Sequence, residues 1–358
     1  MPHVTLNALA LTPSGGGVQT YIRELLRSLA HRPGLELSAA VQRSAASSVP
    51  RSVRTVVRPD SAGLRRVLAG FRPVGPADVV HALDVDLPAG RTGRKVVTVH
   101  DLAVFDVPHT MSTVRARGEQ LLVAAAVRRA DAVIAVSAFT ATRLAERFGV
   151  EAIEIPLAVR SDLRDAPTPT VDQIGAVRRR FELPARFVLH VGTVEPRKDL
   201  DTLAEACRLA GVPLVLAGGA WTTPPTVGDV RHVGFVGPEQ LAALMAAATL
   251  VAVSSIYEGF CLPAIEALAL GTPVISTPVG ALPDLLPDDA IVPIGDARSM
   301  SRTIAHLVED HAARDRLAEI GRQRVIHRTW DDVAAETVAV YERVLGTEAA
   351  ARTSVGRS

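Results

Sequence analysis

One stretch of the sequence decides the fold class: Phe187-Val188-Leu189-His190-Val191-Gly192-Thr193-Val194-Glu195-Pro196-Arg197-Lys198-Asp199. Its first part, Phe187–Gly192, is a short and mostly apolar run, which is typical of a strand that is buried on both faces of a parallel sheet. A polar loop follows, and an amphipathic helical pattern then covers Leu200–Leu209. This order predicts a βαβ unit whose polar loop lies at the carboxyl end of a parallel strand.

The same alternation of apolar runs and helical patterns extends over most of the chain. The predicted strands are Val4–Leu11, Asp78–Ala82, Lys95–His100, Asp131–Ser137, Glu151–Ile155, Phe187–Gly192, Pro213–Ala217, Arg231–Val236, Leu250–Ser254, Pro273–Ser276 and Ile291–Ile294. The helical patterns include Gln19–Ala30, Thr113–Ala130, Phe139–Phe148, Leu200–Leu209, Glu239–Ala248 and Cys261–Leu270. These runs are too many for one doubly wound sheet of ordinary size, so we predict two sheets.

A proline-rich break between residues 158 and 184 divides the runs into two series. We therefore predict an α/β protein with two Rossmann-like domains that face each other, over residues 1–165 and 166–329. A helix over residues 330–346 is expected to cross back to the first domain, and residues 347–358 form a polar tail.

Length and composition agree with two globular domains. The chain has 358 residues, of which 48% are apolar, and this excludes a largely disordered chain. We find no apolar run long enough for a transmembrane helix, no signal peptide and no disulfide framework, and we expect a cytoplasmic protein. The net charge of +1 argues against a nucleic-acid partner. Lys95 and Lys198 are the only lysines beside 37 arginines, an excess typical of a GC-rich genome such as that of an actinobacterium.

Two loops carry groups that suit a phosphate. Thr12-Pro13-Ser14-Gly15-Gly16-Gly17 lies between the first strand and a helix, where glycines allow close backbone approach and the helix N-terminus offers free N–H groups. In the second loop, Arg197 and Lys198 place two cations at the carboxyl end of a strand, where open α/β sheets bind ligands. The alternatives are a tight turn for the first loop and a solvated charged loop for the second.

A third loop, within Ser254–Glu266, carries two glutamates. Glu258 lies in a glycine-containing loop after a strand, and Glu266 lies on the following helix. The amides of residues 259–262 would point from the helix N-terminus towards a ligand. The glutamates could accept hydrogen bonds from sugar and ribose hydroxyls. One alternative is that they are the carboxylate pair of a glycosidase, although the helix would carry Glu266 away from the reacting carbon. Another is that they are two surface glutamates without a function.

These motifs, in this order, resemble glycosyltransferase family 4, and the resemblance covers nearly the whole chain. The matching pieces are Gly15-Gly16-Gly17, Val99-His100-Asp101, Asp131-Ala132-Val133-Ile134-Ala135-Val136-Ser137, Glu195-Pro196-Arg197-Lys198, Val233-Gly234-Phe235-Val236-Gly237, the Glu258 and Glu266 spacing, and Gly271-Thr272-Pro273-Val274-Ile275. The resemblance implies the GT-B fold and a retaining hexosyltransferase. It implies a nucleotide-sugar co-substrate, linked to UDP or GDP, and neither a metal nor another cofactor.

The resemblance also implies a role for each matching residue. Arg197 and Lys198 would bind the donor diphosphate, Glu258 would hold the transferred sugar, and His100 would reach that sugar near the reacting carbon. The expected donor-binding residues are Gly16, Gly17, Gly234, Phe235, Val236, Gly259, Phe260, Cys261, Leu262 and Glu266. The chain departs from many relatives at Thr193, where they carry an arginine, and Arg197 would substitute for it.

The N-terminal domain is expected to hold the acceptor. Its candidate residues are Tyr21, Asp101, His109 and Arg115. His100 has an alternative role as a buried histidine at a strand end that bonds a backbone carbonyl. We interpret Asp84-Val85-Asp86, which has the spacing of a metal motif, as a loop feature. We assign no protein nucleophile, because the acceptor hydroxyl is expected to attack from the face that the diphosphate leaves.

Residues 51–72 carry six arginines against one acid, with Leu64, Val67, Leu68 and Phe71 at helical spacing. This predicts a basic amphipathic helix that either touches anionic lipid or packs on its own domain. The acceptor could be a sugar, a lipid-linked molecule or a small molecule, in polysaccharide, glycolipid or natural-product synthesis, for example of aminoglycosides. A nucleotide-sugar epimerase and a non-catalytic nucleotide-sugar-binding module are the alternative functions.

Overall fold

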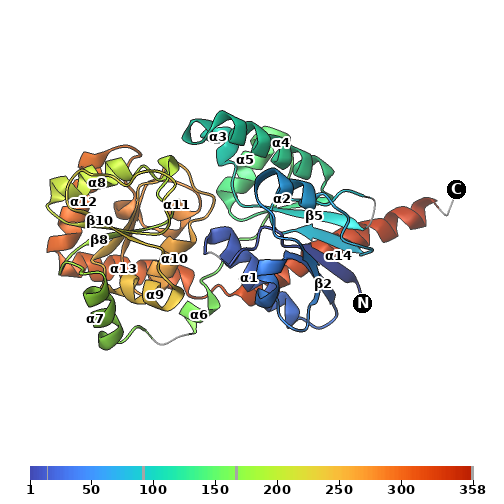
Figure 1. Cartoon of the computed structure of the whole chain (residues 1–358), viewed down its shortest axis with the longest axis horizontal. Coiled ribbons are helices and arrows are strands. Elements are labelled where there is room, and N and C mark those ends of the chain that lie inside the picture. The colour runs from blue at the N-terminus through green and yellow to red at the C-terminus, as the bar shows by residue number, and fades with distance from the viewer. Residues whose placement is uncertain (14, 91–92, 166–167, 356–358) are drawn as a thin grey trace. The chain divides into compact units, whose positions relative to one another are not determined.

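The computed structural model describes the chain except residues 14, 91–92, 166–167 and 356–358, and except the side chains of residues 63–64, 67 and 347–355. The chain divides into two compact units (Figure 1). Unit 1 consists of Met1–Asp106, Thr113–Leu157 and Trp330–Ser358, and unit 2 of Val107–Ser112 and Ala158–Thr329. Each unit contains one parallel sheet with helices, which confirms the predicted α/β class.

Unit 1 is built on a seven-stranded parallel sheet with the order β3-β2-β1-β4-β5-β6-β7. The strands are β1 (His3–Asn7), β2 (Glu36–Gln42), β3 (Arg54–Arg58), β4 (Val79–Ala82), β5 (Arg94–Val99), β6 (Ala132–Ala135) and β7 (Ile153–Glu154). The helices are α1 (Gly17–Ala30), α2 (Gly63–Gly70), α3 (Ala103–Asp106), α4 (Thr113–Arg129), α5 (Ala138–Phe148) and α14 (Trp330–Val355), with a 3₁₀ turn at Arg43–Ser48. The central strands β1 and β4 are buried, which is why they form continuous apolar runs in the sequence.

Unit 2 is built on a five-stranded parallel sheet with the order β10-β9-β8-β11-β12. The strands are β8 (Val188–Val191), β9 (Leu214–Ala217), β10 (Val230–Gly234), β11 (Leu250–Val253) and β12 (Val274–Ser276). The helices are α6 (Ser161–Arg164), α7 (Val171–Arg180), α8 (Leu200–Ala210), α9 (Pro238–Ala247), α10 (Leu262–Ala269), α11 (Leu282–Leu285), α12 (Ala297–Glu309) and α13 (His311–Val325), with 3₁₀ turns at Pro108–Thr110, Pro196–Lys198 and Asp288–Ala290.

Each sheet has one point where the strand order reverses direction. In unit 1 this point lies between β1 and β4, and in unit 2 it lies between β8 and β11. Loops that leave such neighbouring strands diverge to opposite sides and open a crevice at the carboxyl ends, which is where open α/β sheets bind ligands. The topology therefore brings the loop after β8 and the loop after β11 to the same crevice of unit 2.

A buried chain of hydrogen bonds fastens α14 to the sheet of unit 1. The Tyr341 hydroxyl lies 2.7 Å from Nδ1 of His81, and Nε2 of His81 lies 2.9 Å from the Thr98 hydroxyl. The Thr98 hydroxyl lies 2.8 Å from that of Tyr21 on α1. Each of these four side chains is at most 2% exposed. Because their polar groups have no access to water, each depends on its partner in the chain.

Helix α14 is the segment that was expected to return to the first domain, and in Figure 1 it lies beside α1. Trp330 at its start and Tyr341 are buried in unit 1. The predicted end at residue 346 is too early, since the helix runs to Val355. A single glycine, Gly346, costs a helix only about 1 kcal/mol relative to alanine, and the residues after it include three alanines.

The structure also corrects other expectations. The predicted domain boundary after residue 165 lies within unit 2, because α6 packs against α10. The expected strand over Ile291–Ile294 contributes only a single bridge, between Ile291 and Ser276. The strand β2 was not predicted, since its sequence Glu-Leu-Ser-Ala-Ala-Val-Gln lacks a run of β-branched residues.

The expected helix over residues 51–72 is wrong in its first half, where Arg54–Arg58 forms the edge strand β3. Arginines suit an edge strand because one of its sides faces solvent. Only α2 is helical, and its Leu68 is 59% exposed. Phe71 is half-buried, and the side chains of Leu64 and Val67 lie outside the described ones.

Tyr341→Phe tests the buried hydrogen-bond network that joins α14 to the sheet of unit 1. The change leaves Nδ1 of His81 without its partner, so we expect the free energy of unfolding of unit 1 to fall by about 1–3 kcal/mol. Urea unfolding followed by tryptophan fluorescence measures this, because Trp330 is buried in unit 1 whereas Trp221 is exposed. Glu342→Ala, at an exposed position of the same helix, is the control and should leave the transition unchanged. Equal unfolding transitions for Tyr341→Phe and wild type would contradict a stabilising role of this hydrogen-bond network.

Candidate functional site

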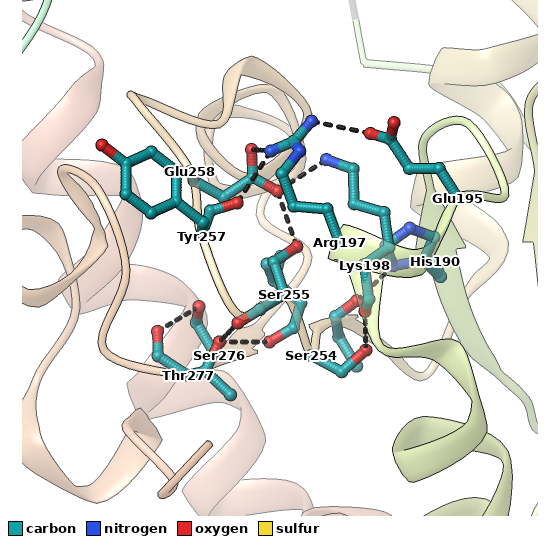
Figure 2. Close-up of polar contacts among 12 residues, drawn as sticks. His190, Glu195, Arg197, Lys198, Ser254, Ser255, Tyr257, Glu258, Ser276 and Thr277 are labelled. Carbon is teal, nitrogen blue, oxygen red and sulfur yellow. Dashed lines mark hydrogen bonds and ion pairs between the residues drawn. The ribbon is translucent and has the colours of Figure 1, made fainter. Parts of the chain in front are cut away.

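The switch point of unit 2 brings together three of the predicted catalytic residues. Arg197 and Lys198 lie in the 3₁₀ turn Pro196–Lys198 after β8, and Glu258 lies in the loop after β11 (Figure 2). Nη1 of Arg197 lies 3.0 Å from Oε2 of Glu258, and Nζ of Lys198 lies 2.6 Å from Oε1. One carboxylate thus pairs with two cations that come from the neighbouring strand's loop.

The Glu258 carboxylate is buried and ionised. It also accepts a hydrogen bond of 2.6 Å from the Ser255 hydroxyl. Burial alone would raise the pKa of this carboxyl group, but the charges of Lys198 and Arg197 and the hydrogen bonds outweigh it and hold the pKa at about 2. A carboxylate that stays ionised can accept hydrogen bonds only, which suits it to sugar hydroxyls.

Further contacts fix the two cations and the loop. Arg197 donates to the backbone oxygen of Tyr257 at 2.7 Å and to the Glu195 carboxylate at 2.7 Å. Its own backbone oxygen accepts from the amide of Ile256 at 2.9 Å. The Ser254 hydroxyl donates to the backbone oxygen of Lys198 at 2.7 Å. The loops after β8 and β11 are therefore joined through both side chains and backbone.

The segment after β12 supports the Glu258 loop from behind. The Thr277 hydroxyl donates to the backbone oxygen of Ser255 at 2.6 Å (Figure 2). Gly280 has φ +58°, and a Cβ atom there would lie 2.9 Å from the backbone oxygen of Glu258. Both the backbone conformation and the close approach require glycine at this position.

Glu266, the second predicted glutamate, lies on α10 and is 4% exposed. Its Oε1 lies 3.9 Å from Nε of Arg160, which also bonds Asp162 at 2.6 Å. Sequence reasoning missed Arg160, because it precedes the short helix α6 in a segment with no recognisable motif. Nη2 of Arg160 is buried and makes no hydrogen bond within the described part of the chain.

The N-terminus of α10 follows the Glu258 loop directly. The side chains of Phe260 and Leu262 are buried, so a ligand could reach only their backbone. Cys261 has φ +78°, which is a strained conformation for a residue other than glycine. Burial is the main cause that raises the pKa of the Cys261 thiol to about 12, and the thiol is therefore neutral. Gly259 is buried between Glu258 and Phe260.

The ends of β9 and β10 present two exposed aromatic rings. Phe235 follows Gly234, which has φ +71°, and its side chain is 65% exposed, whereas Val236 is buried. Trp221, for which the sequence predicts no ligand-binding role, is 64% exposed. Its amide donates to the backbone oxygen of Val194 at 2.9 Å, so it is tied to the loop that carries Arg197 and Lys198.

The remaining donor-side candidates belong to unit 1. Gly16 and Gly17 lie at the start of α1, as the glycine-rich loop predicts, and Ser14 in that loop lies outside the described residues. His100 follows β5, and its Nε2 lies 2.9 Å from the backbone oxygen of Leu83. The alternative role for His100, a histidine at a strand end that bonds a backbone carbonyl, requires a contact of this kind.

The expected acceptor residues are in different environments. Tyr21 is 2% exposed and its hydroxyl bonds that of Thr98, so its side chain is part of the core of unit 1. Asp101 accepts from the Ala103 amide at 3.0 Å and caps α3. His109 is exposed, and Arg115 pairs with Glu119 at 2.8 Å on α4.

The Asp84-Val85-Asp86 stretch is a loop after β4. Asp86 is buried and lies 2.9 Å from Nη1 of Arg66, and Asp84 lies 3.9 Å from the same nitrogen. Asn7, at the end of β1, donates to the backbone oxygen of Asp86. The loop thus fastens α2 to the sheet of unit 1 through Arg66, an arginine of the basic stretch over residues 51–72.

Glu258→Gln tests the charge balance of the site. The native pKa of about 2 lies below the ordinary value of 4.5, so ionised Glu258 stabilises the fold above about pH 4.5, and this contribution is lost as the pH falls towards about 2. We expect the variant to be less stable than wild type at about pH 7, by an amount on the order of 3 kcal/mol. The difference should shrink steadily as the pH is lowered.

Urea unfolding of both proteins over this pH range measures the difference. Glu205→Gln is the matched control, because Glu205 also pairs with an arginine, at 2.7 Å, but on an exposed helix surface. That variant should show little change at any pH. A difference for Glu258→Gln that is independent of pH would contradict the assignment of an ionised, paired carboxylate.

Known proteins match both halves of the chain. Residues 15–159 match the profile described as Glycosyltransferase Family 4, and residues 177–324 match Glycosyl transferases group 1. A D-inositol 3-phosphate glycosyltransferase of Xylanimonas cellulosilytica is 30% identical, with 92% of each chain covered. The O-antigen chain mannosyltransferase B of Escherichia coli is 26% identical, with 74% of each chain covered.

A solved structure has the same fold. Anabaena Alr3699/HepE, in a complex with UDP-glucose, superposes with a TM-score of 0.71 at 18% sequence identity, covering 95% of this chain and all of that one. Two parallel sheets, the two profile matches and a relative that is 30% identical over 92% of this chain lead to one conclusion. The chain belongs to glycosyltransferase family 4 and is a transferase with the GT-B fold.

Proposed function

We propose that this enzyme moves a hexose from a UDP- or GDP-linked donor to an acceptor hydroxyl and retains the anomeric configuration. The observation that carries the proposal is the Arg197–Glu258–Lys198 cluster at the switch point of unit 2. Arg197 and Lys198 bring charged N–H donors to one place, and such donors suit the oxygens of a diphosphate. The ionised carboxylate between them suits the hydroxyls of the attached sugar.

The two cations have a direct role in the proposed reaction. When the bond between the anomeric carbon and the diphosphate oxygen breaks, negative charge grows on that oxygen. Arg197 and Lys198 are fixed before the reaction, so they stabilise the developing charge more than the ground state. The N-terminus of α10 adds its positive dipole end. These groups supply the stabilisation that a divalent metal would otherwise give, and we propose a metal-independent reaction.

The bond to the acceptor forms as the bond to the diphosphate breaks. The acceptor oxygen attacks from the side that the diphosphate leaves, and its proton passes to the leaving phosphate oxygen. Glu258 is a poor candidate for a nucleophile, because a pKa of about 2 makes its carboxylate weakly basic and three side chains already bond it. We therefore assign it to binding the sugar.

The donor base and the ribose have candidate partners in the same unit. The Gly234–Val236 backbone lies at the end of β10, two strands away from β8 in the sheet. Neighbouring strands are about 4.8 Å apart, so the end of β10 is about 10 Å from that of β8. This separation suits a nucleotide whose base lies at the end of β10 and whose diphosphate lies at the end of β8. Glu266, an ionisable acceptor on α10, suits the ribose hydroxyls.

The acceptor and the pathway are proposed more broadly. The mannosyl and inositol phosphate glycosyltransferases among the relatives favour a sugar, a lipid-linked molecule or a natural product, and favour transfer over an epimerase or a non-catalytic module. A lipid-linked acceptor would bring α2 to a membrane surface, where Leu68 and the exposed Arg65 suit anionic lipid. Among the described residues, no helix is long and apolar enough to span a bilayer.

Lys198→Ala and Glu266→Ala test the donor site. Calorimetric titration with UDP and GDP should show at least about tenfold weaker binding for each variant, because a hydrogen bond to a charged group contributes about 1.5–3 kcal/mol. Lys95→Ala removes the only other lysine, in unit 1, and should leave binding unchanged. Wild-type nucleotide affinity and full transfer in both site variants, with native melting curves, would refute the donor-site assignment.

A further inference from the structure

His190 is a buried histidine of unit 2 to which no role has been given above. It lies on β8 and is 2% exposed. Its Nδ1 lies 3.1 Å from the backbone oxygen of Ala252 on β11. A carbonyl oxygen only accepts hydrogen bonds, so Nδ1 carries the proton and Nε2 carries a lone pair. The ring therefore bridges the two strands that border the switch point.

The Nε2 atom of His190 is close to Lys198. A Cβ atom on Gly192 would lie 3.1 Å from Nε2 of His190 and 3.5 Å from Cε of Lys198, and 3.8 Å from its Nζ. Glycine at position 192 thus leaves the space in which the imidazole edge and the end of the lysine side chain meet. Figure 2 shows His190 beside Lys198, on the side of the lysine away from Glu258.

This Nε2 atom is buried and makes no hydrogen bond within the described part of the chain. Burial, and secondly the charge of Lys198, lower the pKa of His190 to about 4, so the ring is neutral near neutral pH. A buried acceptor without a partner is costly, and such a group in a native structure requires an explanation. The Lys198 ammonium carries three N–H groups, of which one bonds Glu258, and the end of its side chain borders the same space beside Gly192 as Nε2 does.

We propose that His190 is a positioning residue for Lys198, with its uncharged Nε2 edge holding the ammonium group in place for the donor diphosphate. The inference rests on the proposed function. A neutral acceptor orients the ammonium without cancelling its charge. A carboxylate at this place would neutralise Lys198, and a second cation would repel it. When the sugar hydroxyls bind Glu258 and weaken its hold on Lys198, the Nε2 lone pair accepts a hydrogen bond from the ammonium group in its place.

Two substitutions separate the functions of the two ring nitrogens. His190→Asn keeps a donor near Nδ1 for the Ala252 oxygen and removes the Nε2 acceptor. His190→Gln places a polar atom near the position of Nε2. We expect UDP and GDP to bind about five- to tenfold more weakly to His190→Asn, with His190→Gln closer to wild type, as measured by calorimetry. His81→Asn, at a buried histidine of unit 1, is the control for a loss of stability alone and should not change nucleotide affinity.

A double-mutant cycle with Lys198→Ala decides whether His190 acts through Lys198. If it does, adding His190→Asn to Lys198→Ala weakens nucleotide binding no further. Equal losses in both backgrounds, or no loss in either, would overturn this inference and leave the donor site in place. Wild-type affinity in Lys198→Ala alone would overturn both the inference and the proposed function. Melting curves of all variants show whether each one is folded.

Discussion

The charge balance between Glu258, Arg197 and Lys198 is the constraint on which the rest of the site depends. The Glu258 carboxylate is buried and its two cationic partners are only partly exposed, so removal of either partner leaves the buried charge less well compensated. The same contacts join the loop after β8 to the loop after β11. Stability and function are therefore coupled here, because the groups that hold the crevice together are also the groups that a nucleotide-sugar would need.

Backbone geometry makes this arrangement possible. A Cβ atom on Gly218 would lie 2.0 Å from the backbone oxygen of Gly192, so glycine lets the ends of β8 and β9 approach closely. Asp199 and Cys261, which precede α8 and α10, both have left-handed backbone conformations. Strained residues that are not glycine persist where surrounding contacts determine them, and such places are commonly ligand sites. Helices α8 and α10 thus begin immediately after the loops that carry Lys198 and Glu258.

The sequence alone predicts much of the fold because its central strands are continuous apolar runs between amphipathic helices. It fails at β2 and β3, whose alanines and arginines lack that pattern, and at β3 arginines suit an edge strand as well as a basic helix face. For the site, the motifs predict that Arg197, Lys198 and Glu258 share one crevice. They do not predict that one carboxylate binds both cations, because this depends on β11 lying next to β8. His190 and Arg160 were missed, since neither stands in a motif and their partners are distant in sequence.

The location of a bound nucleoside diphosphate tests the central claim most directly. In a crystal of the enzyme soaked with UDP or GDP, we predict phosphate oxygens within about 2.7–3.2 Å of the Arg197 guanidinium and the Lys198 ammonium. A ribose close to Glu266 would agree with this placement. A nucleotide bound elsewhere, with the Arg197–Glu258–Lys198 cluster undisturbed, would contradict the account.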